Sequence, residues 1–119
     1  MEKIIKIEYN YTSLGKMLYL NIDVQDNKLT VVKNGLDFQK IMEEHELKNI
    51  VADIIDNTMH WKEENLNNSV IDGFEFYLKI YTNQEVTTKH FKNVIPQNMS
   101  EFNKIIEEVT KWTYTKNII

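Results

Sequence analysis

Polar and apolar residues alternate through the first third of the chain, which is the period of β-strands with one buried face. Residues 3–11 place apolar side chains on one face at Ile5, Ile7, Tyr9 and Tyr11. Residues 16–24 and 28–33 show the same alternation, and the segments between the three are short and polar. This pattern predicts an antiparallel meander of three strands.

A helical pattern follows the third strand. Asn34 belongs to a residue type that caps helices, and Asp37 occupies the capping-box position three residues later. The next apolar positions share one helical face: Phe38, Ile41, Met42 and His45. A second stripe, in a different phase, runs through Leu47, Ile50, Val51, Ile54, Thr58 and Trp61. The pattern therefore predicts a short helix and a longer one, with a break at residues 45–48.

Alternation returns after a polar loop at residues 62–73. The inward positions of this fourth strand are Phe74, Phe76, Leu78 and Ile80. Residues 85–92 are expected to form a fifth strand, paired with the fourth. Asn98 then stands in the cap position of a last helix, with Glu101 in the capping-box position. The apolar face of this helix runs from Phe102 to Trp112.

These elements predict a single α+β domain over residues 1–119. We expect an antiparallel sheet of about five strands with two or three helices packed on one face. The expected order is three strands, one or two helices, two strands and a final helix. Segment 18–44 also echoes segment 76–108 in its residue types. Two explanations stand for this echo: a duplicated hairpin-and-helix unit, or convergence, because capping and core spacing favour the same residues.

Composition narrows the classes of function. The chain has no cysteine, which excludes disulfides, thiolate nucleophiles and cysteine-based zinc sites. All 14 basic residues are lysine, so the bidentate contacts that arginine makes to guanine or phosphate are unavailable. The net charge of −4 repels nucleic acid on average. We therefore expect no nucleic-acid partner.

No apolar run is longer than four residues, whereas a membrane-spanning helix needs about 20. The first residues mix charged and apolar side chains, unlike the apolar core of a signal peptide. These observations predict no membrane association and a cytoplasmic location.

The three histidines suggest little chemistry. His45 lies on the apolar face of the first predicted helix, where a hydrogen-bonded boundary histidine is the usual explanation. His60 stands four residues from both Asp56 and Glu64, so the three could share a helix face and bind a divalent metal, although chance produces this spacing often. His90 is expected on the surface of a strand. The sequence therefore predicts no catalytic residue, no metal and no cofactor.

Two groups of residues are candidates for partner binding. Tyr19, Tyr77 and Tyr81 point away from the predicted core, either as ordinary cross-strand pairs or as an exposed stripe of a residue type favoured at interfaces. Glu43 and Glu44 belong to acidic clusters, which are either solvated helix surface or a face that docks a basic partner. We predict that these five residues contact a partner protein.

The segment from residue 61 to residue 102 contains a recognisable combination of motifs. Asp72-Gly73-Phe74-Glu75-Phe76 is followed by Asn93-Val94-Ile95-Pro96-Gln97-Asn98 and a final helix. This combination resembles small uncharacterised proteins of Gram-positive bacteria and their phages. The chain departs from that pattern by lacking a glycine in the hairpin turn and by having phenylalanine where tryptophan is frequent. The resemblance implies an α+β fold and transfers no catalytic residue.

The sequence predicts a non-catalytic protein-binding domain, monomeric or homodimeric, with an unidentified protein partner. Some small α+β proteins of the kind it resembles are immunity proteins for secreted toxins, and some phage-encoded ones inhibit host defence. An inhibitor of that type, acting by surface complementarity, is the alternative. A small-molecule-binding domain or an enzyme is the further alternative.

Overall fold

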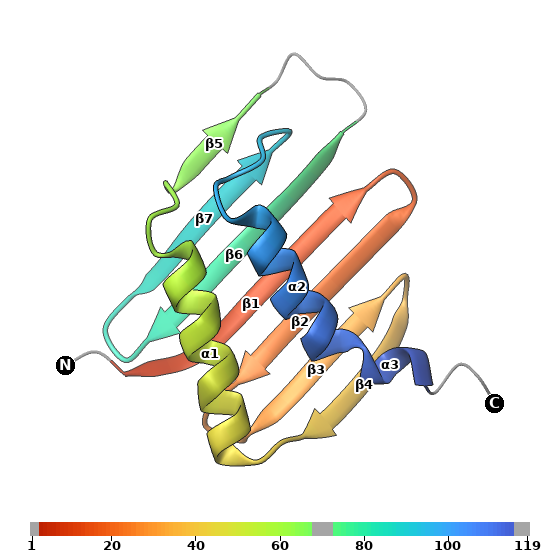
Figure 1. The fold of residues 1–119 in the computed structure, drawn as a ribbon, viewed down its shortest axis with the longest axis vertical. Helices are drawn as coiled ribbons and strands as arrows, with labels where there is room; N and C mark the ends of the chain where they lie inside the picture. Colours follow the sequence, from red (N-terminus) through yellow and green to blue (C-terminus); the bar gives the residue numbers. More distant parts are fainter. Residues whose placement is uncertain (1–2, 68–72, 116–119) are drawn as a thin grey trace.

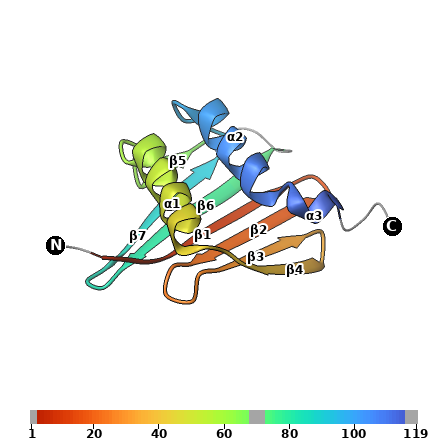
Figure 2. The same ribbon diagram turned by 60° about the horizontal axis from the view of Figure 1, so that its bottom comes forward.

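A seven-stranded sheet is covered on one face by two long helices in the computed structural model (Figures 1 and 2). The structure describes residues 3–67 and 73–115. The strands are β1 (Ile4–Ser13), β2 (Lys16–Asp23), β3 (Lys28–Lys33), β4 (Leu36–Ile41), β5 (Glu64–Leu66), β6 (Phe74–Thr82) and β7 (Val86–Lys92). The helices are α1 (Glu44–Thr58), α2 (Met99–Thr110) and α3 (Trp112–Thr115). The prediction of an α+β fold with helices on one face is confirmed.

The strand order is β4-β3-β2-β1-β6-β7-β5, so the first strand lies in the middle of the sheet. Strand β1 pairs antiparallel with β2 on one side and with β6 on the other. Every neighbouring pair in the described sheet is antiparallel except β5 and β7, which run parallel. The central position of β1 brings residues from the two halves of the chain side by side, with Glu8 opposite both Asn21 and Lys79.

The core lies between the sheet and the helices. The predicted inward residues Phe76, Leu78 and Ile80 are buried there, and Phe74 is half-buried beside them. Aromatic rings fill the centre: the Phe76 ring lies 4.8 Å from that of Phe91, and the Trp61 ring lies 5.2 Å from that of Phe102. The Trp61 indole donates to the Gln97 carbonyl at 2.8 Å, which satisfies its only polar atom.

Helix α1 confirms the second apolar stripe. Its buried residues are Leu47, Val51, Ile54 and Thr58. Lys89 on the inward face of β7 closes the end of this helix, because its ammonium group donates to the Thr58 and Met59 carbonyls at 2.9 and 3.1 Å. The carbonyls at a helix end have no partner within the helix, and that of Thr58 also accepts from the Trp61 backbone N–H at 3.0 Å.

The short helix predicted from Asn34 is wrong. Asn34 and Gly35 both have positive φ angles, 47° and 88°, which is the backbone of a type I′ turn. The turn reverses β3 into β4, where Phe38 pairs with Val31 and is buried, whereas Ile41 is 69% exposed. An edge strand can form with a single buried side chain. The helical spacing of Phe38, Ile41 and Met42 was therefore not enough to distinguish a helix from a strand. The break predicted at residues 45–48 is also wrong, because α1 runs through it.

Three further expectations are corrected. The sheet has seven strands rather than five and is mixed rather than antiparallel, because β4 and β5 were missed and β5 pairs parallel with β7. Strand β5 lies within the stretch expected to be a loop, and it is held by backbone hydrogen bonds to β7, as between Asn67 N and Lys92 O at 2.9 Å. Asn98 does precede α2, but with φ of 63° and no capping hydrogen bond from its side chain.

The internal echo does not extend to a common unit. Asn34 and Asn93 do share a role, since each has positive φ and accepts a backbone N–H of a neighbouring strand, from Met17 at 2.8 Å and from Phe74 at 2.9 Å. The chain enters β4 after Asn34, whereas it enters the Pro96 loop and α2 after Asn93. The helix of the first unit is therefore absent. Asp72, the first residue of the Asp72-Gly73-Phe74-Glu75-Phe76 motif, lies outside the described residues.

Candidate functional site

The face of the sheet opposite the helices, called here the open face, has no covering layer within the described residues (Figure 2). The molecule measures 45 × 43 × 21 Å, and its shortest dimension fits one sheet and one layer of helices, each about 10 Å thick. Side chains from four central strands project on this face: Lys6, Glu8, Asn10, Tyr19, Asn21, Glu75, Tyr77, Lys79, Tyr81, Thr88 and His90. The three tyrosines predicted to point outward do lie here.

Glu8 holds two of these tyrosines. The Tyr19 hydroxyl donates to Glu8 Oε2 at 2.6 Å, and the Tyr81 hydroxyl donates to Glu8 Oε1. Burial alone would raise the pKa of Glu8, but the two hydrogen bonds and the charges of Lys6 and Lys79 outweigh it, so the pKa is lowered. The carboxylate is thus ionised at neutral pH. Its hydrogen bond is also the main cause that raises the pKa of Tyr81.

A second carboxylate holds the third tyrosine. Glu75 accepts from the Tyr77 hydroxyl at 3.3 Å and contacts His90 Nε2 at 2.6 Å. The Tyr77 and His90 rings are stacked, with centroids 4.1 Å apart and planes at 6°. Tyr77 remains 36% exposed. Both clusters therefore present aromatic rings whose orientation is fixed before any partner arrives.

A shallow hollow of about 210 Å³ lies between the two clusters, lined by Glu8, Asn10, Tyr19, Tyr77 and Lys79. The charges around it are of both signs, and Lys6 lies over the Tyr81 ring at 4.3 Å from its centroid. The titratable groups are engaged with one another. The ionised Glu8, held by two phenols, is a weak proton acceptor, and His90 has its Nε2 against Glu75 and one ring face against Tyr77.

Glu43 and Glu44 lie on the other side of the molecule, at the start of α1 (Figure 1). The structure therefore does not bring the five candidate residues together. Both glutamates are exposed and belong to an acidic helix layer over residues 43–58 and 99–111. Its acidic side chains are Glu43, Glu44, Glu46, Asp53, Asp56, Glu101, Glu107 and Glu108, against lysines at 48, 104 and 111. This layer has a formal charge of −5, more negative than the −4 of the whole chain.

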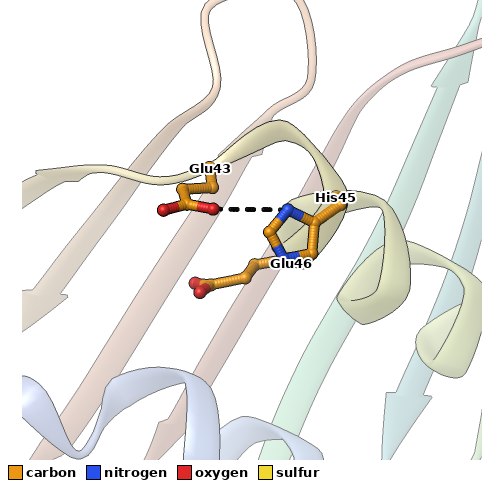
Figure 3. Close-up of side chains that lie close together, drawn as sticks. All are labelled: Glu43, His45 and Glu46. Atoms are coloured by element: carbon orange, nitrogen blue, oxygen red, sulfur yellow. Dashed lines mark ion pairs between the residues drawn. The ribbon is translucent and has the colours of Figure 1, made fainter.

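The described residues contain one group with the side-chain types of a metal site, Glu43, His45 and Glu46 (Figure 3). Their ligand atoms lie within 4.8 Å of one another, and His45 Nδ1 is 3.3 Å from Glu43 Oε2. All three are exposed, and acidic residues in the first turn already suit the positive end of the helix dipole. We assign no metal to them. His45 was expected at a core boundary, and its exposed position corrects that expectation.

The sequence misplaced His60 and, for His90, predicted the outward face of the strand but not its partners. Helix α1 ends at Thr58, so His60 does not share a helix face with Asp56 and Glu64, and no such metal group forms among the described residues. His90 is half-buried and bonded to Glu75 rather than free on the surface. Its partners follow from the register of the β6–β7 hairpin, which places Tyr77 opposite His90. Counting outward from a two-residue turn at 83–84, which sets Tyr81 opposite Val86, would have found this pair.

Comparison with known proteins identifies no relative: no protein-family model matches the chain, and no curated protein matches it in sequence. None of the described helices is long and apolar enough to cross a membrane.

Proposed function

We propose that this chain is a non-catalytic domain that binds a protein partner through the open face of its sheet. The observation that supports the proposal best is the pair of carboxylates, Glu8 and Glu75, that fix Tyr19, Tyr77, Tyr81 and His90 on a face without helices. Tyrosine gives large contact area at interfaces and still offers a hydroxyl. Rings that are already oriented lose less side-chain entropy on binding.

The tyrosines and the two glutamates cannot share one standard interface. Such an interface buries about 800 Å² on each partner, and the two groups lie on opposite faces of the molecule. We assign the contact to the tyrosines, because the acidic side chains of α1 are exposed and pair locally, as Glu44 does with Lys48 at 2.9 Å. Exposed pairs of this kind contribute little energy.

Affinity purification with matched variants tests this assignment. Tyr77→Ala/Tyr81→Ala should lose a protein that the wild-type chain captures from a lysate of its own cells, and should weaken the purified complex at least tenfold, as expected for buried aromatic contacts. Glu43→Lys/Glu44→Lys, on the opposite face, should capture the same protein as wild type. The tyrosine variant loses two hydrogen bonds, to Glu75 and to Glu8, so it should melt roughly 5–15 °C below wild type and still be folded at the temperature of the assay.

Two results would reject the open face. Equal recovery of every captured protein with the tyrosine variant would show that these rings are not the contact. Loss of capture only with the glutamate variant would move the interface to the helices.

A toxin-immunity or phage anti-defence inhibitor is a specific alternative. The charge of −5 on the helix layer favours it, because such a surface speeds association with a basic target. In this version the helix face binds, and affinity should fall steeply with salt. Co-purification with the product of an adjacent toxin gene, at low and at high salt, tests it.

A further inference from the structure

A second hollow lies on the helix side of the sheet, between α2 and the ends of β1, β2 and β6. Its volume is about 520 Å³, within the range of about 300–1,000 Å³ in which proteins bind small molecules. Apolar side chains form its walls: Tyr11, Leu18, Phe74, Ile95, Met99 and Ile106. Part of this wall is open, since Ile95 is 73% exposed. An apolar occupant would cover that surface.

The base of the hollow contains a polar group without a partner. Tyr9 is only 3% exposed, and its ring packs against Phe102 with centroids 5.0 Å apart. Its hydroxyl makes no hydrogen bond within the described chain, yet Tyr9 is among the residues that line the hollow. Burial raises the pKa of this phenol, so it keeps its proton and is available as a donor. The hydroxyl oxygen is not among the fully buried unpaired atoms of the described residues, so it reaches the space of the hollow, where a ligand that brings an acceptor can take its hydrogen bond.

The rim of the hollow restricts the charge of a ligand. Its polar residues are Ser100, Asn103 and Glu107 on α2, and no lysine lines it. The Glu107 carboxylate repels an anion, and no cationic side chain is among the described residues that line the hollow. An uncharged molecule avoids this repulsion and also the cost of removing a charge from water beside apolar walls.

We propose that this hollow binds a small uncharged organic molecule with an aromatic or alicyclic body and a carbonyl or ether oxygen. The body packs between Leu18 and Ile106, and the oxygen accepts from the Tyr9 hydroxyl. This site lies on the face opposite the proposed protein-binding surface and does not depend on it.

Acetophenone, an aromatic ketone without charge, is a suitable probe. In methyl NMR spectra of the whole chain, titration should shift the signals of Leu18, Met99 and Ile106. Tyr9→Phe removes only the hydroxyl and should weaken acetophenone roughly fivefold, the value of one net hydrogen bond. The same variant should melt no lower than wild type, because the lost hydroxyl had no partner. If Tyr9 served structure alone, Tyr9→Phe would lower the melting temperature and leave the acetophenone affinity unchanged.

Position 103 and its neighbour provide a matched pair of variants. Asn103→Trp fills the hollow and should abolish the shifts, whereas Lys104→Trp, on the side of α2 toward α1, should leave them. Benzoate should bind more weakly than acetophenone, and Glu107→Gln should narrow that difference. Shifts that are absent or lie elsewhere, or an affinity unchanged by Tyr9→Phe, would overturn the proposal.

Discussion

Phe76→Ala is the sharpest test of the core. Phe76 has no exposed surface, and its ring contacts those of Phe91, Tyr9 and Trp61 at centroid distances of 4.8, 5.6 and 5.9 Å. Replacing a buried phenylalanine with alanine costs about 3–5 kcal/mol, and the cost is highest where the walls cannot collapse into the cavity. Tyr9 and Phe91 are on strands paired with β6 on both sides, so we expect about 4–5 kcal/mol.

A domain of this length has a total stability of about 6–18 kcal/mol, so the variant should still fold at low temperature. Urea unfolding followed by Trp61 fluorescence measures the change directly, because Trp61 packs against the mutated site. The dependence of the free energy on urea should stay unchanged. The melting temperature should fall by about 15–20 °C.

Phe74→Ala is the matched control. Phe74 lies on the same strand and the same face but is half-buried, so it should cost about half as much. A cost below about 1 kcal/mol for Phe76→Ala would show that the inward face of β6 has been assigned incorrectly.

Two further predictions concern the open face and the turn before β4. Glu8→Gln should be less stable than wild type at pH 7, and the difference should shrink as the pH falls below the unfolded pKa of about 4.3, because the stability given by a lowered folded pKa is lost as the pH falls through that value. Urea unfolding of both proteins at pH 7, 5 and 3 measures this, and a difference that does not change with pH would contradict it. Gly35→Ala should cost about 1–2 kcal/mol, since φ is 88° and an added Cβ meets no atom within 4 Å, so that only the backbone angle matters. Gly35→Asn should cost less in the same thermal melts, and an alanine variant as stable as wild type would exclude the type I′ turn.

The sequence determined the elements whose own residues are repetitive enough to specify them. Alternation fixed β1, β2, β3, β6 and β7, because a strand with one buried face must place apolar residues at every second position. The helical stripes fixed α1 and α2 in the same way. The assignment of Tyr19, Tyr77 and Tyr81 to the outward face also followed from alternation alone.

Prediction from the sequence failed where a short segment fitted both the strand period and the helix period. Phe38, Ile41 and Met42 fit a helix face, yet Phe38 is buried in the core, Met42 after the strand packs against it, and Ile41 is exposed at the sheet edge. The Asn34-Gly35 pair was the local signal for that strand, since both residues tolerate the positive φ angles of a type I′ turn. Strand β5 gave no such signal, because its three residues are held by pairing with β7.

Only the tertiary structure decided which residues meet. The pairing of β1 with β6 joins residues about seventy positions apart, and it brings Tyr81 to Glu8, which the β1–β2 hairpin already places beside Tyr19. The same packing of helices on one face separates the tyrosines from Glu43 and Glu44, and it leaves the Tyr9 hydroxyl unpaired beside α2. Alternation states which way a side chain points along its own strand. Which strand becomes its neighbour is decided by contacts between residues distant in the chain. The free energy of those contacts depends on the whole sheet and core.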